Sequence, residues 1–146
     1  MRRDLTRPAV FGSFDGTASL LGVVIYLLFS HPALIFPAAV SGAASSAVSM
    51  GGGEWLSDSD NGFAASLVMA AATFVGAILP AVPFAFGTGP AAAAESAVLC
   101  AGICLTVAGL REDRGYGLAL LETFGILAAV IAITVACGLF LPGGAS

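Results

Sequence analysis

Five long apolar stretches are the feature that most constrains how this chain can fold. Short turns rich in proline, glycine or charged residues separate them, and they cover residues 9–29, 33–56, 63–86, 91–110 and 116–141. A helix needs about 20 apolar residues to cross the hydrocarbon core of a bilayer. Each stretch is too long for a strand, and a helix satisfies every backbone polar group within its own segment. The sequence therefore predicts an all-α integral membrane protein, with one domain of five transmembrane helices over residues 1–146.

The composition agrees with this fold class. Hydrophobic residues make up 58% of the chain and charged residues only 10%, whereas about a quarter of a soluble domain is charged. The mean hydropathy is +1.00, and a soluble protein of 146 residues could not bury so much apolar surface. No long polar segment indicates a separate soluble domain, and no basic run indicates nucleic acid. The expected partner is the lipid bilayer.

The arginines predict the orientation of the chain in the membrane. Lysine is absent, and the cationic side chains are Arg2, Arg3, Arg7, Arg111 and Arg114. Cytoplasmic segments of membrane proteins carry an excess of arginine and lysine, so we expect a cytoplasmic N-terminus and an outside C-terminus. The first apolar stretch contains Asp15 and no signal-peptide cleavage pattern, so we expect it to be retained as a helix. A compact chain without a targeting segment favours the plasma (inner) membrane of a prokaryote.

Acidic residues inside the apolar stretches are the candidate functional residues. With this orientation, Asp15, Glu54 and Glu122 all lie in the inner third of the membrane, on three different helices. Met50 lies four residues before Glu54, which places both side chains on one helix face. Glu95 lies close to the outer end of its stretch, near a possible outer mouth. A carboxylate in the apolar layer is costly, so its default interpretation is a functional site.

The residue types at these positions point to metal chemistry. No arginine or lysine is expected within the stretches to neutralise the acids. Carboxylate oxygens bind divalent cations, and a thioether such as that of Met50 favours transition metals over magnesium or calcium. Metal binding releases protons from its ligands, so such a site could exchange protons for a metal ion. The pattern predicts a proton-coupled transporter of divalent metal ions.

Each acid also has a structural interpretation. Glu54 would lie at the level of the lipid headgroups, and Asp15 would be an early-turn acid stabilised by the helix dipole. Glu122 would be structural, and Glu95 would be a solvated acid at a helix start. The chain would then be a non-transporting structural or accessory membrane protein. An enzyme is not expected, and no catalytic residue is predicted, because the chain has one histidine and no Ser/His or Cys/His constellation.

Small residues recur at four-residue spacing in the first two stretches. Gly12 and Gly16 flank Asp15, and a ladder of small residues follows at Ala38, Gly42 and Ser46. Small residues let helices approach closely, and two-fold pairs are the commonest oligomers. Five helices are few to enclose a polar pathway, whereas two protomers could enclose one between them. We therefore expect a homodimer.

Several motifs resemble the vacuolar iron transporter family. The first stretch carries Phe14-Asp15-Gly16, and the second closes on Ser49-Met50-Gly51-Gly52-Gly53-Glu54-Trp55-Leu56-Ser57. The proline-containing residues 76–84 and the fifth stretch, with Glu122 and residues 125–129, are similar to the third and last helices of that family. The resemblance covers most of the chain, and the motif in the second stretch is its most specific part.

The resemblance implies a homodimer of five-helix protomers that exports ferrous iron or manganese from the cytosol in exchange for protons. It implies that Asp15, Met50 and Glu54 line the translocation path, whereas Glu122 and Glu95 have no firm counterpart. Fe²⁺ or Mn²⁺ would be the transported substrate, with no permanently bound cofactor. Many family members insert a glutamate-rich domain between the second and third helices, but here the connection is only residues 57–62. Asp58 and Asp60 in that connection are a hypothetical entrance funnel.

Overall fold

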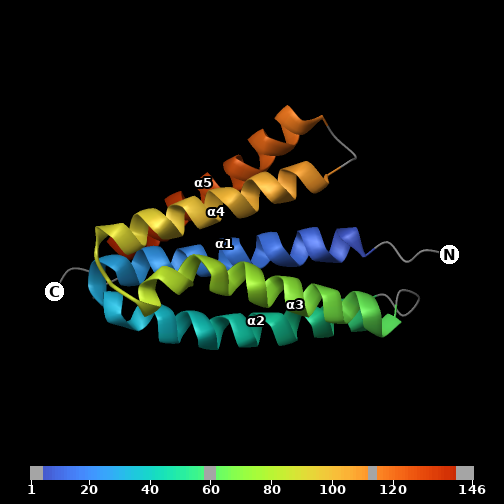
Figure 1. Ribbon diagram of the computed structural model, residues 1–146, viewed down its shortest axis with the longest axis horizontal. Helices are drawn as coiled ribbons and strands as arrows, with labels where there is room; N and C mark the ends of the chain where they lie inside the picture. The colour runs from blue at the N-terminus through green and yellow to red at the C-terminus, as the bar shows by residue number, and fades with distance from the viewer. Residues whose placement is uncertain (1–4, 58–61, 112–114, 141–146) are drawn as a thin grey trace.

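Five long helices make up the structure. The computed structural model describes residues 5–57, 62–111 and 115–140, except for the side chain of Leu139. Figure 1 shows the helices, which are α1 Thr6–Ser30, α2 Ile35–Ser57, α3 Gly62–Ala81, α4 Pro90–Leu110 and α5 Tyr116–Phe140. All five are long and apolar enough to cross a membrane, and the described residues contain no strand. These findings confirm the predicted all-α fold of five membrane-length helices.

Proline and glycine set the helix boundaries. Proline disfavours helical backbone in the preceding residue, and α1 ends at Ser30, just before His31-Pro32. The short 3₁₀ helix η1, Pro32–Leu34, then leads into α2. At the far end of α3, Pro83 lies in a second 3₁₀ helix, η2 Val82–Ala85, because proline cannot donate the backbone hydrogen bond that an α-helix needs there. Gly62 opens α3 with a φ of 67°, which glycine adopts without steric cost.

Helices α1 and α3 make the closest contact in the fold. Gly12 and Gly16 of α1 lie against α3, and a methyl group on Gly16 would overlap the carbonyl oxygen of Thr73. The Thr17 hydroxyl lies 2.8 Å from the Ser13 carbonyl oxygen and 2.9 Å from that of Gly76. The spacing of Gly12 and Gly16 therefore produces the close helix approach that the sequence predicts.

Helix α2 packs on α3 through every fourth residue. Its buried residues are Ile35, Ala39, Ala43, Ala47 and Gly51. The Ser66 hydroxyl of α3 donates a hydrogen bond to the Gly51 carbonyl oxygen. The predicted ladder of small residues lies one position away from this buried stripe, and Gly42 is exposed. Both ladders consist of small residues, so the sequence alone did not reveal which of them faces α3.

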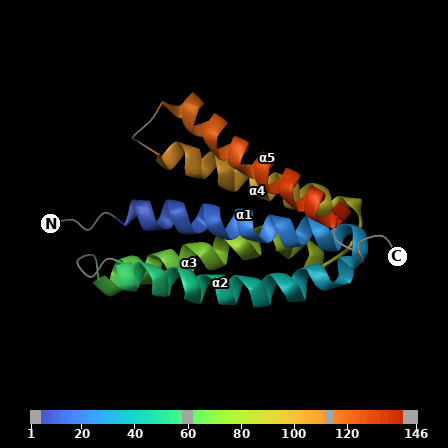
Figure 2. The same ribbon diagram turned by 180° about the vertical axis from the view of Figure 1, so that it is seen from behind.

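The helices form two groups. Figures 1 and 2 show α1, α2 and α3 side by side, with α4 and α5 as a hairpin across α1. The hairpin diverges from α1 toward the end where α1 begins. Ala18, Cys104 and Leu127 form the buried cluster that joins α1, α4 and α5. The two groups are therefore joined at mid-height and spread apart at one end.

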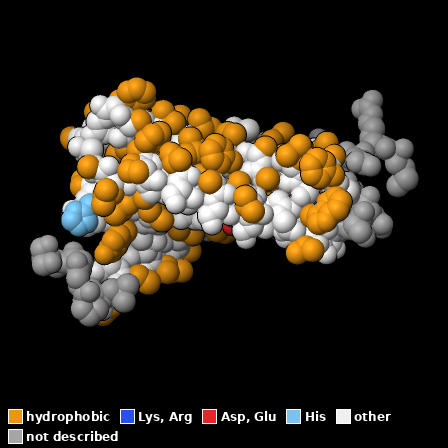
Figure 3. All heavy atoms as spheres, turned by 90° about the horizontal axis from the view of Figure 1, so that it is seen from below, with side chains coloured by type: hydrophobic (Ala, Val, Ile, Leu, Met, Phe, Trp, Pro, Cys, Tyr) orange, Lys and Arg blue, Asp and Glu red, His pale blue; other side chains and the backbone are white. Residues whose placement is uncertain are grey.

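The outer surface is apolar. Figure 3 shows one face covered by hydrophobic and uncharged side chains, with almost no charged side chain in view. Phe29, Leu56 and Phe140 are 84%, 86% and 86% exposed. Large exposed apolar patches on a soluble protein mark interaction or membrane sites. Together with five membrane-length helices, this surface is that expected of an integral membrane protein.

Candidate functional site

Asp15 lies beside a cavity between α1 and α5. Gly12 and Gly16 turn their face of α1 toward α3, so the half-buried Asp15 side chain projects to another side of the helix. There it lines a cavity of about 400 Å³. The cavity is lined by Phe11, Phe14, Asp15, Ala18, Ser19 and Gly22 of α1, and by Ile126, Val130 and Thr134 of α5. Ser19 and Thr134 add hydroxyl groups to the Asp15 carboxylate, and the other lining residues are apolar.

Met50 and Glu54 lie one turn apart near the end of α2, and both are half-buried. Between them, Gly51 packs closely against α3, whereas a Cβ added to Gly52 or Gly53 would meet no atom within 4 Å. Only the first of these three glycines is therefore required by helix packing. The thioether of Met50 and the carboxylate of Glu54 therefore lie beside the contact between α2 and α3.

Two aromatic rings fix the end of α2 to the start of α3. The rings of Trp55 and Phe63 meet edge to face, with centroids 6.2 Å apart and planes at 80°. Edge-to-face pairs of this kind are favourable beyond the area that they bury. This contact holds Glu54, the preceding residue, at a defined position at the end of the bundle.

Glu122 is part of an ion pair. Its Oε2 atom lies 2.9 Å from Nη1 of Arg111, and both side chains are about one quarter exposed, at 29% and 26%. Arg111 follows the last residue of α4, so the pair ties the end of α4 to the second turn of α5. As expected, Arg111 lies outside the apolar stretches, but it follows α4 directly and reaches Glu122, so this acid has a cationic partner.

No three of the predicted acids come together within the described part of one chain. Glu95 is exposed near the start of α4, far along the helix from Arg111. Within residues 5–57, 62–111 and 115–140, no three His, Cys, Asp or Glu side chains could jointly hold a metal ion. Asp58 and Asp60, the hypothetical entrance funnel, lie outside the described residues. The described part of the chain therefore presents a half-buried carboxylate on α1 and a half-buried thioether–carboxylate pair on α2.

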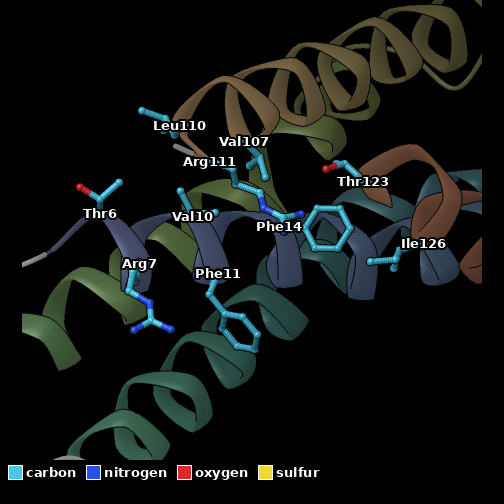
Figure 4. Close-up of a pocket in the computed structure, with 10 residues that line it drawn as sticks. All are labelled: Thr6, Arg7, Val10, Phe11, Phe14, Val107, Leu110, Arg111, Thr123 and Ile126. Carbon is cyan, nitrogen blue, oxygen red and sulfur yellow. The ribbon is translucent and has the colours of Figure 1, made fainter. Parts of the chain in front are cut away.

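A larger cavity was missed by sequence reasoning. It has a volume of about 590 Å³ and lies between the start of α1 and the α4–α5 hairpin, as Figure 4 shows. It is lined by Thr6, Arg7, Val10, Phe11, Phe14, Val107, Leu110, Arg111, Thr123 and Ile126. Arg7 and Arg111 were visible in the sequence, but only as signals of orientation. Their presence in the lining of one cavity depends on how α4 packs on α1, which no local pattern specifies.

The fold thus defines the class of protein, a five-helix protein suited to the membrane. Comparison of the chain with protein families, with curated proteins and with solved structures finds no match in any of the three.

Proposed function

We propose that this protein transports a divalent transition metal ion, ferrous iron or manganese, out of the cytosol in exchange for protons. The observation that carries the proposal is Asp15, a half-buried carboxylate about two turns into a membrane-length helix, beside a cavity of about 400 Å³. A carboxylate at such a depth is costly unless it has a partner. A transported cation, or the proton that replaces it, provides that partner.

The pair of Met50 and Glu54 supports the choice of metal. The two side chains share one face of α2 and are both half-buried. The thioether favours transition metals over magnesium and calcium. The Ser-Met-x-x-Gly-Glu-aromatic-x-Ser pattern around them resembles that of the vacuolar iron transporter family, in which these positions line the path.

The proposed working unit is a homodimer. The described part of one chain holds no cluster of three His, Cys, Asp or Glu side chains, whereas a two-fold axis would double every ligand that faces it. Phe11 lines the Asp15 cavity and is 57% exposed in the single chain, which leaves that side of α1 available to a second copy. Native mass spectrometry in mild detergent should therefore find two chains, and a purely monomeric protein would count against the shared pathway.

The proposed orientation has a cytoplasmic N-terminus and an outside C-terminus, in the plasma membrane of a prokaryote. The support for it is the arginine distribution, since the opposite orientation inverts the positive-inside rule. In this orientation Asp15 and Glu54 both lie toward the cytosolic end, where a metal ion leaving the cell would enter. Protease access to an N-terminal tag from outside intact cells would contradict it.

A structural or accessory membrane protein is the second candidate. The ion pair between Arg111 and Glu122 favours it, because this acid already has a partner that stabilises the fold. On this alternative, Asp15 would also serve packing, and the chain would move no metal.

The metal content of cells separates these two functions. Cells that express the parent chain in excess iron or manganese should hold less metal than cells with an empty vector. Cells that express Asp15→Asn should match the empty vector. Thr106→Ala is the control, because Thr106 is exposed on α4 and lines neither cavity. Equal metal content in all strains, with every protein present in the membrane, would favour the structural function.

A further inference from the structure

We propose that the larger cavity, between the start of α1 and the α4–α5 hairpin, binds one anionic phospholipid. The cavity of about 590 Å³ falls within the usual size of small-molecule sites, about 300–1,000 Å³. Its ten lining residues come from three helices, and it lies where the hairpin diverges from α1 (Figures 1 and 4). The site contains neither Asp15, Met50 nor Glu54, although it shares Phe11, Phe14 and Ile126 with the neighbouring Asp15 cavity. Lipid binding there goes beyond the transport function proposed above.

The charge of the cavity mouth favours an anion. Arg7 and Arg111 both line the cavity, and one acid, Glu122, is paired with Arg111. Among the described residues, the lining itself holds two guanidinium groups and no carboxylate. In Figure 4 the Arg111 side chain extends toward Phe14, whereas the Arg7 side chain points away from Arg111, on the other side of the α1 ribbon in this view. This charge repels a metal cation and attracts a phosphate group, which guanidinium groups bind well.

The depth of the cavity matches a lipid better than a soluble anion. Thr6 and Arg7 lie at the mouth, whereas Phe14 is about two turns further along α1, about 10 Å deeper. The interfacial layer of a bilayer is roughly 5–7 Å thick on each side. The cavity therefore passes from the headgroup region into the level of the acyl chains.

The walls change character along that depth. Thr6, Arg7 and Arg111 lie at helix ends, although the Arg111 side chain reaches inward toward Phe14 (Figure 4). Farther in, Val107, Phe14 and Ile126 form apolar walls, and the buried Thr123 adds one hydroxyl group. Ile126 is also 52% exposed, so the cavity opens toward the surrounding lipid. A phosphate joined to acyl chains has the same polar-to-apolar order. Basic pockets between membrane helices are known to hold anionic headgroups.

Competitive lipid binding tests the proposal. The full-length protein in mild detergent is mixed with equal amounts of phosphatidylglycerol and phosphatidylcholine that carry the same acyl chains, and native mass spectrometry measures the ratio of the two bound forms. We expect phosphatidylglycerol to dominate. An arginine near an anionic surface is worth about 1 kcal/mol, so Arg7→Gln should lower the ratio about fivefold, and Arg7→Lys should restore it.

Two further variants should affect the ratio of bound phosphatidylglycerol to phosphatidylcholine differently. Glu122→Gln removes the acid at the mouth and should raise the preference for phosphatidylglycerol. Glu95→Gln removes the same charge from the start of α4, far from the cavity, and should leave the ratio at the parent value. Far-UV circular dichroism shows whether each variant keeps its helices.

Four results would overturn the proposal. The first is an unchanged ratio in a folded Arg7→Gln variant, and the second is an effect of Glu95→Gln as large as that of Glu122→Gln. The third is displacement of phosphatidylglycerol by free glycerol 3-phosphate, which would indicate a soluble phosphate ligand. The fourth is loss of lipid binding whenever two chains associate, which would indicate that a second copy fills the cavity. None of these results depends on metal transport, so lipid binding and transport can fail separately.

Discussion

At the scale of residues, Asp15 and Glu54 are both half-buried but have different surroundings. Asp15 lines a cavity that α5 partly covers. Glu54 lies at the end of α2, one turn from Met50, where the Trp55–Phe63 contact holds the helix end in place. Glu122, by contrast, has an arginine 2.9 Å away. Asp15 and the Met50–Glu54 pair are therefore the stronger candidates for metal contact, and Glu122 has a structural partner.

The sulfur atom of Met50 offers the sharpest test at this scale. Leucine replaces methionine with little change in volume or apolarity, a swap that usually costs less than about 1.5 kcal/mol of stability. If the thioether contacts the metal, Met50→Leu should lower transport of iron or manganese about tenfold, a loss typical of disturbed metal coordination. The measurement is the initial rate of metal uptake into proteoliposomes.

Met69→Leu is the matched control for this prediction. Met69 is buried in α3 and is a packing residue, so the same substitution there should leave the rate close to that of the parent. If both variants transport at the parent rate, or both lose it equally, Met50 has no special role in metal contact.

At the scale of elements, the contact between α1 and α3 organises the fold. Small residues on both helices bring the backbones together, and the Thr17 hydroxyl lies 2.9 Å from the Gly76 carbonyl oxygen across the contact. In a membrane, close packing of this kind replaces the hydrophobic effect as the main force between helices. The α1–α3 pair therefore fixes the position of α1, and with it the side to which Asp15 projects.

Gly76→Ala tests the importance of this contact. A methyl group at Gly76 would overlap the Ser13 carbonyl oxygen, and backbone atoms cannot move aside as a flexible side chain can. Overpacking of this kind typically costs about 1–3 kcal/mol. We expect a clear fall in the thermal unfolding midpoint, measured in detergent by the loss of helical circular dichroism.

Gly102→Ala is the control for this substitution. Gly102 lies on α4, and an added Cβ there would meet no atom within 4 Å. Alanine favours helix over glycine by about 1 kcal/mol, so the midpoint should stay the same or rise. A Gly76→Ala protein as stable as Gly102→Ala would show that the α1–α3 contact is looser than described.

The helices were predictable from the sequence, but their contacts were only partly so. Length, hydropathy and the prolines predict the five helices, because these signals are local. Gly12 and Gly16 correctly indicated a close contact. On α2, however, the buried stripe runs through Ala39 and Ala43, and the exposed Gly42 lies on the neighbouring ladder. In lipid every face of a helix is apolar, so hydrophobic periodicity does not distinguish a buried face from a lipid-facing one.

At the scale of the whole molecule, the candidate residues lie on separate helices of a bundle that opens at one end. The α4–α5 hairpin diverges there from α1 (Figure 2), and the cavity with Arg7 and Arg111 lies at this opening. The sequence could not predict this cavity, because it depends on the angle between the hairpin and α1. The candidate acids themselves were evident in the sequence, because charge is rare inside apolar stretches.

The central claim is that a carboxylate pathway carries metal across the membrane. The most direct measurement is metal flux into proteoliposomes that contain a dye for ferrous iron or manganese, with and without a proton gradient. The parent protein should carry metal into the liposomes faster when the proton concentration is higher inside than outside. Protons then flow out in exchange for the metal ions that enter. Asp15→Asn and Glu54→Gln should both abolish flux while the proteins remain folded. A parent protein that carries no metal, or folded variants that carry it at the parent rate, would contradict the claim.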